Sequence, residues 1–528
     1  MKIHMQHSQT ACNFVYNILA CDKQVERSMQ NRVSNAASQN ASEPVGSAYR
    51  PRTAIIGAGA AGMLQAIKLR EAGLDNVVIY EKANEVGGTW RENRYPGIAC
   101  DVPAHHYNYS FEHNPGWSHR LALGPEIQSY MKKVADKYDL RRSIVFGAKV
   151  TSAVFDGRQW HIETSNGIRD TVDFLVAATG PLHIPAFPNI PGLEEYKGIK
   201  FHTAEWIDGI DLSGKRVGVI GSGSTGTQVI SALAEQGVNL KAFIRTPQWV
   251  FPLPNRKFGK LERAIVSAFP FIGRMTGNFY GWFFEHVFAE AVIKNGWQRK
   301  FLSSMCRWQL GRVKDPVLRE KLTPSDAPLC KRMVMSTAFY PAVARPNVEV
   351  VRDGIVRTTE KGLVDQTGRL HELDIIIFAT GFHARAYHRP IAVTNAQGVT
   401  LDDAWKDQTG AHLSVHVPGF PNFMLIGGPH SPRGNFSAIA YSEAIVDHIV
   451  KVIRHCAENG IHAIEARPEA LAKFREHVMS AIPQTVWTTG CTNWYMDEQG
   501  MPENWTGTPD EYRAILREPN YDEFLLST

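Results

Sequence analysis

Cysteine motifs are missing from this sequence. Its 528 residues include seven cysteines, which are scattered and form no C-x-x-C pair. An odd and scattered set argues against a disulfide framework and against a zinc site, so we expect neither disulfides nor a bound metal. Such cysteine usage is also typical of a reducing compartment, and we therefore expect a cytoplasmic protein.

Long apolar runs and strong charge are missing too. The nearest approach to a membrane span is residues 264–293, which Arg274 and Glu285 interrupt, so we expect no transmembrane helix. The formal net charge is only +5 without a basic run, and nucleic acid is not an expected partner. No feature of the sequence indicates an oligomeric state.

The segment 264–293 is dense in Phe, Tyr and Trp, and we expect it to form one or two helices. Aromatic residues at helical spacing usually pack in a core, and we favour a buried helical layer. The alternatives are the wall of a substrate channel or a peripheral contact with a membrane surface.

The first 50 residues differ from the rest of the chain. The stretch over 28–51 is rich in Asn, Ser and Gln and has no periodic apolar pattern. We therefore expect a disordered leader over 1–50. The remaining length is sufficient for two or three domains.

The pattern G-x-G-x-x-G occurs twice. The first copy consists of Gly57, Gly59 and Gly62, and the second of Gly221, Gly223 and Gly226. Each copy follows a short β-rich run and precedes a helical pattern, which is the context of a dinucleotide-binding turn. The alternative is that both are plain tight loops, which would require the same context to arise twice by coincidence.

The two turns differ in the residue that would meet the ribose. Nineteen positions after the third glycine stands Glu81 in the first copy and Arg245 in the second. A carboxylate accepts hydrogen bonds from ribose hydroxyls but repels a 2′-phosphate, whereas a guanidinium binds that phosphate. We therefore expect FAD or NAD at the first turn and NADP(H) at the second. Two Ala-Thr-Gly turns, in 173–181 and 374–382, are the expected crossings between the two domains.

The segment 84–101 resembles a signature of Baeyer–Villiger monooxygenases, which belong to the class B flavoprotein monooxygenases. That signature requires Gly, Trp, an aromatic residue, Pro, Gly and Asp at fixed spacing, and the chain satisfies every position from Gly88 to Asp101. A second family signature matches residues 196–207 less closely, because Tyr196 replaces Phe and Ile207 replaces Pro or Asp. The resemblance extends from Arg52 to the end of the chain.

The resemblance implies an α/β fold with two Rossmann-like dinucleotide-binding domains and an inserted helical subdomain. The implied boundaries are 51–180 and 381–528 for the FAD-binding domain, 181–253 and 330–380 for the NADP-binding domain, and 254–329 for the helical insertion.

The family places an arginine over the flavin ring, and the Lys-Arg pair that carries it resembles Lys331–Arg332. We expect Arg332 to be catalytic, because a permanent cation would keep a peroxyflavin deprotonated, and Asp101 to orient and charge-balance it. The alternative for such a dipeptide is a solvated basic pair. The implied cofactor-binding residues are Gly57, Gly59, Gly62, Glu81, Gly88, Thr89, Trp90, Asp101 and Tyr107 around the first turn, and Gly221, Ser222, Gly223, Ser224, Thr225, Gly226, Gln228, Arg245, Thr246 and Lys331 around the second.

The expected function is therefore an NADPH- and O2-dependent FAD monooxygenase that converts a small-molecule ketone to an ester or lactone through a peroxyflavin. One alternative is a class B enzyme that oxygenates nitrogen or sulfur. Another is a pyridine-nucleotide disulfide reductase, although Cys100 stands alone where a redox pair would be needed. A third is a non-catalytic, membrane-associated binding protein built on 264–293.

Overall fold

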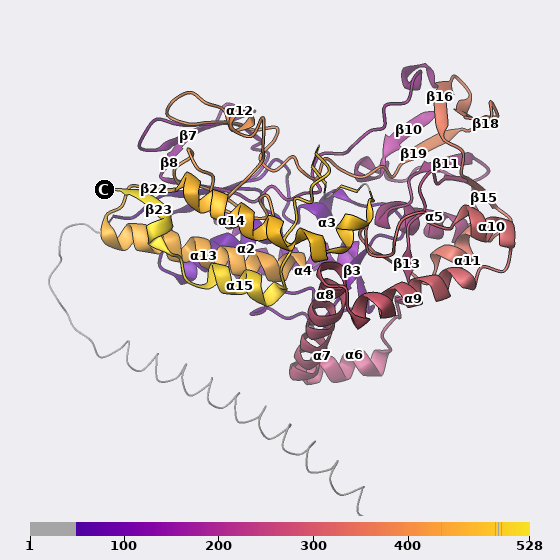
Figure 1. The fold of residues 1–528 in the computed structure, drawn as a ribbon, viewed down its shortest axis with the longest axis horizontal. Helices are drawn as coiled ribbons and strands as arrows, with labels where there is room; N and C mark the ends of the chain where they lie inside the picture. Colours follow the sequence, from indigo (N-terminus) through magenta and orange to yellow (C-terminus); the bar gives the residue numbers. More distant parts are fainter. Residues whose placement is uncertain (1–48, 435, 492, 495, 498) are drawn as a thin grey trace, which may run out of the picture. The chain divides into compact units, whose positions relative to one another are not determined.

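The computed structural model describes residues 49–434, 436–491, 493–494, 496–497 and 499–528. The leader predicted over 1–50 lies, up to residue 48, outside the described residues. From Arg50 to Thr528 the chain forms one unit, and Figure 1 shows its elements along the sequence.

One strand of the first parallel sheet leads into the first glycine-rich turn. Its strand order is β21-β9-β1-β2-β5, and every neighbouring pair is parallel. The strands are β21 (Phe423–Leu425), β9 (Phe174–Ala177), β1 (Thr53–Ile56), β2 (Val77–Tyr80) and β5 (Ile144–Val145). All residues of β1 and β9 are buried. Strands covered on both faces read as continuous apolar runs, as these two do.

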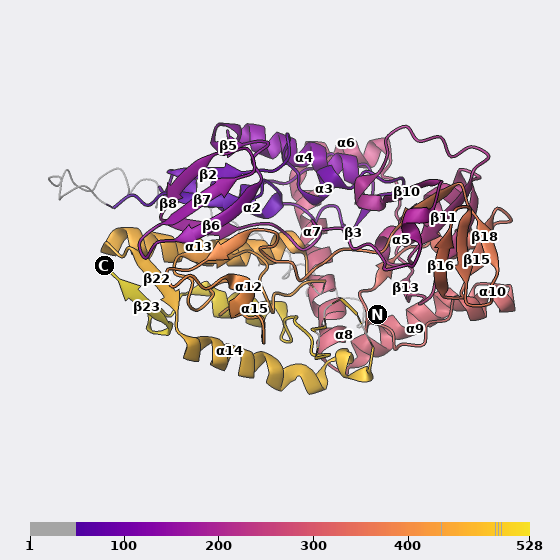
Figure 2. The same cartoon turned by 90° about the horizontal axis from the view of Figure 1, so that it is seen from above.

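Alternate residues of β1 serve two different cores, because successive side chains of a strand face opposite sides. Ile55 packs with the helices α2 (Ala60–Glu71) and α13 (Ala438–Asn459), which Figure 2 shows next to each other. Ala54 and Ile56 pack instead against a second sheet. That sheet has the order β20-β6-β7-β8 and consists of β20 (Ala392–Thr394), β6 (Val150–Phe155), β7 (Trp160–Thr164) and β8 (Arg169–Val172).

One strand of the second parallel sheet leads into the second glycine-rich turn. The strand order of this sheet is β10-β19-β11-β12-β15. Its strands are β10 (Ile199–His202), β19 (Ile375–Phe378), β11 (Arg216–Ile220), β12 (Asn239–Phe243) and β15 (Val348–Val351). Helices α5 (Ser224–Glu235) and α11 (Phe339–Val343) cover one face. The other face packs on β16 (Ile355–Thr359), β17 (Gly362–Asp365) and β18 (Leu370–Glu372). Two Rossmann-like units in one α/β chain confirm the expected fold class.

The two Ala-Thr-Gly turns lie at the crossings between the sheets. The outward segment leaves β9 and the return segment leaves β19, and the two run side by side. Ala186 donates its N–H to the Gly381 carbonyl at 2.9 Å, and His383 donates to Ile184 at 2.9 Å. The chain thus passes between the two sheets on a paired double strand, as expected from these turns.

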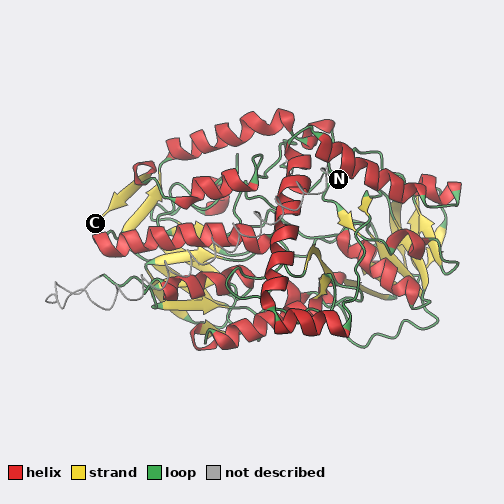
Figure 3. Ribbon diagram, turned by 90° about the horizontal axis from the view of Figure 1, so that it is seen from below, coloured by secondary structure: helices red, strands yellow, loops and turns green. Residues whose placement is uncertain are grey.

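The helical insertion consists of α6 (Lys260–Ala268), α7 (Pro270–Phe283), a π-helix η4 (Phe284–Ala289), α8 (Glu290–Ile293), α9 (Trp297–Gly311) and α10 (Pro316–Lys321). The expectation that 264–293 is a buried layer is correct only for its second half. Val287–Val292 are nearly all buried, but Leu261 of α6 and four large apolar side chains of α7 are more than half exposed. Figure 3, the view from below, shows the long helix that contains α7 on the near side.

The other helices and strands lie outside the two parallel sheets. They are α3 (Thr89–Glu92), β3 (Ala99–Pro103), β4 (Leu121–Leu123), α4 (Gly124–Lys137), β13 (Val250–Phe251), β14 (Val334–Met335), α12 (Leu401–Ala404), β22 (Ala463–Ala466), α14 (Pro468–Ala481), α15 (Pro509–Arg517) and β23 (Phe524–Ser527). Short 3-10 helices lie at 141–143, 193–195, 203–205, 482–484, 486–489 and 521–523. Within the described residues, no helix has both the length and the apolar character needed to cross a bilayer.

Cys330 and Cys491 form a disulfide with their Cα atoms 6.1 Å apart. The expectation that the cysteines stay unpaired is therefore wrong for this pair. The two residues are 161 positions apart, and the fold brings them together, which spacing along the sequence could not reveal. Cys100, Cys306 and Cys456 are buried and unpaired. Among the described residues, no group of three or more His, Cys, Asp or Glu side chains is placed to hold a metal ion.

Candidate active site

The first glycine-rich turn has a backbone that only glycine fits. Gly57 has φ +104°, and a Cβ atom there would lie 2.8 Å from the carbonyl oxygen of Ala178. Gly59 lies against Gly88, where an added Cβ would be 3.1 Å from the Gly59 Cα. The turn therefore leads directly into the N-terminus of α2, where backbone N–H groups can bind a pyrophosphate.

Glu81 follows β2 and is buried beside this turn. Its carboxylate accepts the N–H of Ala58 at 2.7 Å and the N–H of Ala83 at 2.9 Å. These bonds fix the carboxylate next to the turn and leave lone pairs on both oxygens for further donors. Ribose binding by Glu81 stays a prediction.

Thr89 and Trp90 begin the short helix α3 directly after Gly88. The indole Nε1 of Trp90 donates to the Tyr107 hydroxyl at 3.1 Å, and the two rings meet edge to face. Burial raises the pKa of Tyr107 far above its usual value, so this hydroxyl remains protonated. The two predicted aromatic residues thus form a fixed pair on the side of the first turn where Gly88 lies.

The second turn repeats the first. Gly221 has φ +117°, and its missing Cβ leaves room for the carbonyl of Ala379. Ser222 donates its hydroxyl to the Thr246 carbonyl at 2.9 Å, which joins the turn to the residue that follows Arg245. Gly223 caps α5, and Ser224, Thr225 and Gly226 lie in its first turn.

Arg245 stands at the end of β12 with its side chain exposed. Within the part of the chain that the structure describes, it makes no hydrogen bond or ion pair. An arginine without a protein partner beside a dinucleotide turn is available to a phosphate. Lys331, by contrast, forms an ion pair with Asp326 at 2.5 Å.

The signature segment 84–101 connects the two nucleotide turns. Tyr95 donates its hydroxyl to Gln228 Oε1 at 3.0 Å, and Gln228 Nε2 donates to the Ala99 carbonyl at 2.9 Å. Gly97 lies so close to α5 that a Cβ would be 2.8 Å from the Gln228 carbonyl. Gln228 therefore links the signature segment to α5, and its predicted contact with the cofactor stays a prediction.

Asp101 ends up at the meeting point of three elements. It lies on β3, it accepts the hydroxyl of Ser224 from the start of α5 at 3.0 Å, and it accepts Arg332 Nη2 at 3.2 Å. The Asp101 side chain is 12% exposed and that of Arg332 is 39% exposed. The predicted pair is thus in contact, between the two glycine-rich turns.

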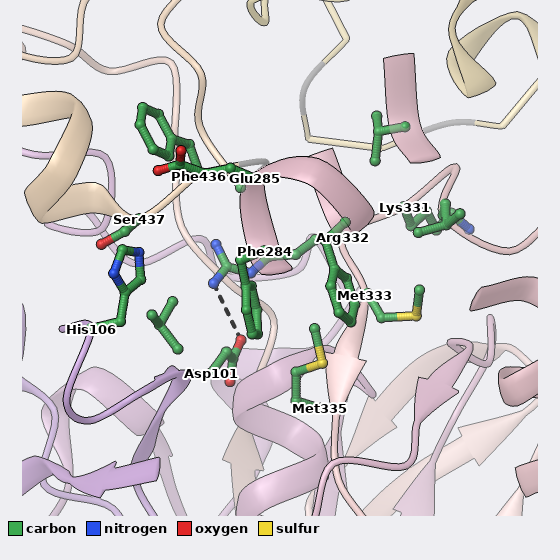
Figure 4. Close-up of a pocket in the computed structure, with 15 residues that line it drawn as sticks. Asp101, His106, Phe284, Glu285, Lys331, Arg332, Met333, Met335, Phe436 and Ser437 are labelled. Carbon is green, nitrogen blue, oxygen red and sulfur yellow. Dashed lines mark hydrogen bonds and ion pairs between the residues drawn. The ribbon is translucent and has the colours of Figure 1, made fainter. Parts of the chain in front are cut away.

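Arg332 and Lys331 point to opposite sides of their strand-like segment (Figure 4). Arg332 extends toward Asp101, beside the ring of Phe284, into a cavity. The other residues that line this cavity are Val102, His106, Glu285, Phe288, Val292, Leu329, Lys331, Met333, Met335, Gly434, Phe436 and Ser437. Most of these side chains are apolar, so the cavity favours an apolar ligand beside the cation of Arg332.

The polar groups of the cavity wall are held in defined states. Burial lowers the pKa of His106 to about 4, so the imidazole is neutral at pH 7. Glu285 forms an ion pair with Arg513, whose guanidinium lies 4.7 Å from the centre of the Phe436 ring. The Nε2 of His106 and the Oγ of Ser437 are buried and have no hydrogen-bond partner among the described residues.

The sequence did not identify most of the cavity wall. His106 and Ser437 come from segments without a motif, and only the fold brings them to Arg332. The aromatic density of 264–293 was a usable signal, because Phe284 and Phe288 form one wall. This part of the segment lines the cavity, and a role as the wall of a substrate channel stays a prediction.

The second signature lies away from this cavity. His202 is fully buried, accepts the N–H of Ala204 at 3.1 Å and contacts the rings of Phe187 and Phe382. Burial lowers its pKa. Ile207, the departure from the family pattern, is 42% exposed and does not line the cavity.

Comparisons with known proteins agree with this geometry. A family model described as pyridine nucleotide-disulphide oxidoreductase matches residues 54–257. An uncharacterized monooxygenase of Mycobacterium tuberculosis is 45% identical over 476 residues, or 90% of this chain and 96% of that protein. A Baeyer-Villiger monooxygenase of Streptomyces coelicolor is 38% identical over 481 residues, or 90% of this chain and 92% of that protein. The chain belongs to the Baeyer–Villiger monooxygenases.

Solved structures of this kind superpose on most of the chain. A cyclohexanone monooxygenase from Rhodococcus bound to NADP+ has a TM-score of 0.81 at 31% identity and covers 91% of this chain and 100% of its own. A complex of OTEMO with FAD and NADP has a TM-score of 0.80 at 29% identity, with 91% and 100% coverage. The disulfide-reductase alternative receives no support from the site, since Cys100 is buried and unpaired.

Proposed function

We propose that this Baeyer–Villiger monooxygenase oxidises a ketone to an ester or lactone with NADPH and O2, and that Arg332 and Asp101 are its catalytic pair. In the overall reaction, ketone, O2, NADPH and a proton give ester, water and NADP+. The observation that carries the proposal is the Asp101–Arg332 contact at a mostly apolar cavity between two dinucleotide turns. Oxygenation of nitrogen or sulfur is not favoured, because the relatives that cover 90% of the chain include named Baeyer-Villiger enzymes.

The residues present fit FAD at the first turn. Gly57 and Gly59 leave open the space that a pyrophosphate needs, and Glu81 stands ready for the ribose. At the cavity of Arg332, the buried His106 Nε2 and Ser437 Oγ have no hydrogen-bond partner among the described residues, which is the state expected beside a site that a ligand completes. When bound, FAD supplies acceptance of the NADPH hydride and activation of O2.

The second turn fits NADPH. Arg245 offers two parallel N–H donors to a 2′-phosphate, and its permanent charge suits this role better than that of a lysine. Thr246 is held next to it by Ser222. Lys331 would join them only by leaving Asp326, with which it is paired in this structure.

Arg332 stabilises negative charge that develops at the reacting oxygen. A cation that is already in place does this without reorganisation, and a largely apolar cavity strengthens the interaction. Asp101 fixes the guanidinium of Arg332 toward the cavity. The hydroxyl of Ser224 and Nη2 of Arg332 both donate to the same carboxylate oxygen of Asp101, so Ser224 in turn holds Asp101 in place. Asp101 also balances the positive charge of Arg332.

The apolar wall excludes water from the reacting groups. Phe284, Phe288 and Phe436 cover the cavity, and the Glu285–Arg513 ion pair holds that wall in place. Exclusion of water limits the loss of activated oxygen as hydrogen peroxide. The same wall indicates a ketone with a sizeable apolar body.

We also propose a cytoplasmic location, since the reaction consumes NADPH. Disulfides of cytosolic proteins are usually transient, so the Cys330–Cys491 bond would then respond to the redox state of the cell. We also propose a peripheral membrane contact through 264–293.

A product assay tests the function. The full chain with FAD, NADPH and air is incubated with cyclic, linear and aryl ketones, a thioether and a tertiary amine. Esters or lactones that carry one atom from 18O2 are the expected products. Sulfoxide or amine oxide without any ester would contradict the proposal.

A further inference from the structure

Helix α7 packs on the protein through its small residues and exposes its large apolar side chains. Its inner face is a row of glycines, Gly273, Gly277 and Gly281, which lie against His105 and His106. A Cβ at Gly277 would collide with the His105 carbonyl oxygen. The helix is therefore held to the rest of the chain by its smallest residues.

The large apolar side chains of α7 point outward instead. Phe271, Met275, Phe279 and Trp282 are 54%, 62%, 60% and 54% exposed. Their spacing along the helix places them on one face. The preceding helix α6 and the link to α7 continue this exposure with Leu261, Ile265 and Phe269, at 75%, 41% and 54%. These seven residues are called the outer stripe below.

The outer stripe is accompanied by positive charge. Between residues 256 and 284 the chain has five basic residues, Arg256, Lys257, Lys260, Arg263 and Arg274, and a single acidic one, Glu262. Glu262 is neutralised by Arg256, with which it forms an ion pair at 2.6 Å. Within the described residues, no carboxylate forms an ion pair with the other four basic side chains.

The same helix continues to the active-site cavity. After Phe283, α7 passes without a break into η4 and α8, and the side chains of Phe284, Phe288 and Val292 line the cavity of Arg332. Trp282 of the outer stripe and Phe284 of the cavity wall are therefore neighbours on one helix, two residues apart.

We propose that the outer stripe docks on the surface of an anionic phospholipid bilayer, from which an apolar ketone reaches the cavity. Aromatic and aliphatic residues on one face of a helix with Lys and Arg beside them are the composition of helices that lie in a bilayer interface. The excess positive charge fits anionic headgroups, whereas two copies of this surface would repel each other. The part of the proposal that concerns the ketone rests on the proposed function, and the part that concerns docking does not.

Vesicle sedimentation tests the docking. The FAD-loaded full chain is mixed with sucrose-filled vesicles, either of phosphatidylcholine alone or with phosphatidylglycerol added. We expect binding to the anionic vesicles that weakens with salt. The double variant Phe279→Ser/Trp282→Ser should reduce the partition coefficient about tenfold or more, because it removes two large apolar side chains that the bilayer interface would bury. Val317→Ser, on exposed α10, is the matched control and should bind like the unaltered chain.

Three results separate the possibilities. Equal binding of the double variant and the unaltered chain, or no binding of either, would overturn the docking proposal. A dimer in sedimentation velocity without vesicles, lost in the double variant, would overturn it in favour of a second copy of the chain. A long-chain ketone dissolved in the vesicles should be oxidised more slowly by the double variant, while a water-soluble ketone should be oxidised at an unchanged rate. Absence of product from both ketones would refute the proposed function and leave the docking result intact.

Discussion

Arg245→Ala would remove the one side chain that, in our account, makes the second turn specific for NADPH. The guanidinium is exposed and has no partner in the described part of the chain, so the variant breaks no internal contact. Its unfolding free energy should therefore change by less than about 0.5 kcal/mol. Any kinetic change then reports on the nucleotide and not on the fold.

The size of the kinetic effect follows from the charge-assisted contacts that would be lost. Hydrogen bonds to a charged group contribute about 1.5–3 kcal/mol, and for an exposed side chain we expect the lower half of that range. At about 1.4 kcal/mol per factor of ten, KM for NADPH should rise roughly 10- to 40-fold. KM for NADH should not change, because NADH has no 2′-phosphate.

The assay is NADPH and NADH oxidation at 340 nm over a range of ionic strength. The unaltered chain should show a KM for NADPH that rises with salt, and the variant should show a weaker salt dependence. Arg345→Ala, an exposed arginine beyond α11, is the matched control. Equal losses for NADPH and NADH would refute the reasoning, since they would show that Arg245 acts on something other than the 2′-phosphate.

Three further predictions concern stability and the release of hydrogen peroxide. Gly277→Ala should destabilise the chain by about 1–3 kcal/mol in thermal melts, while Gly311→Ala, with open space at its Cβ, should not. Cys491→Ser, or dithiothreitol, should increase hydrogen peroxide per NADPH, because the disulfide holds the C-terminal segment to the residue before Lys331; an unchanged ratio would contradict this. Burial lowers the pKa of His448 to about 4. Between pH 6.5 and pH 4 the unfolded chain therefore binds a proton at His448 that the folded chain does not. The free energy of unfolding should fall over this range by up to about 1.4 kcal/mol per pH unit. Urea unfolding of His448→Gln should show a smaller fall.

The two nucleotide turns were predictable because their chemistry is local. The glycines, the strand before them, the helix after them and the residue at the end of the next strand lie within a few tens of positions. The contact of Asp101 with Arg332 could be expected only from the family resemblance, because 231 positions separate the two residues. The contacts of Gln228 with Tyr95 and Ala99 were not predictable for the same reason, since these partners precede it by more than 100 positions.

The outer face of α7 shows a different limit. Aromatic residues at helical spacing predict one apolar face, but they do not say which face meets the protein. Here the glycines pack inward and the aromatic residues face out, because close approach to His105 and His106 leaves no room for a side chain. The disulfide between Cys330 and Cys491 was hidden because pairing depends on the fold and not on spacing.

The central claim is that Arg332, held by Asp101, makes oxygen transfer to a ketone possible. The most direct test is the amount of ester formed per NADPH consumed by the unaltered chain and by Arg332→Ala, with hydrogen peroxide measured in the same samples. Arg332→Ala should still oxidise NADPH but should release hydrogen peroxide in place of ester, with a loss of ester of at least about 100-fold. Ester formation at an unchanged yield in Arg332→Ala would contradict the account.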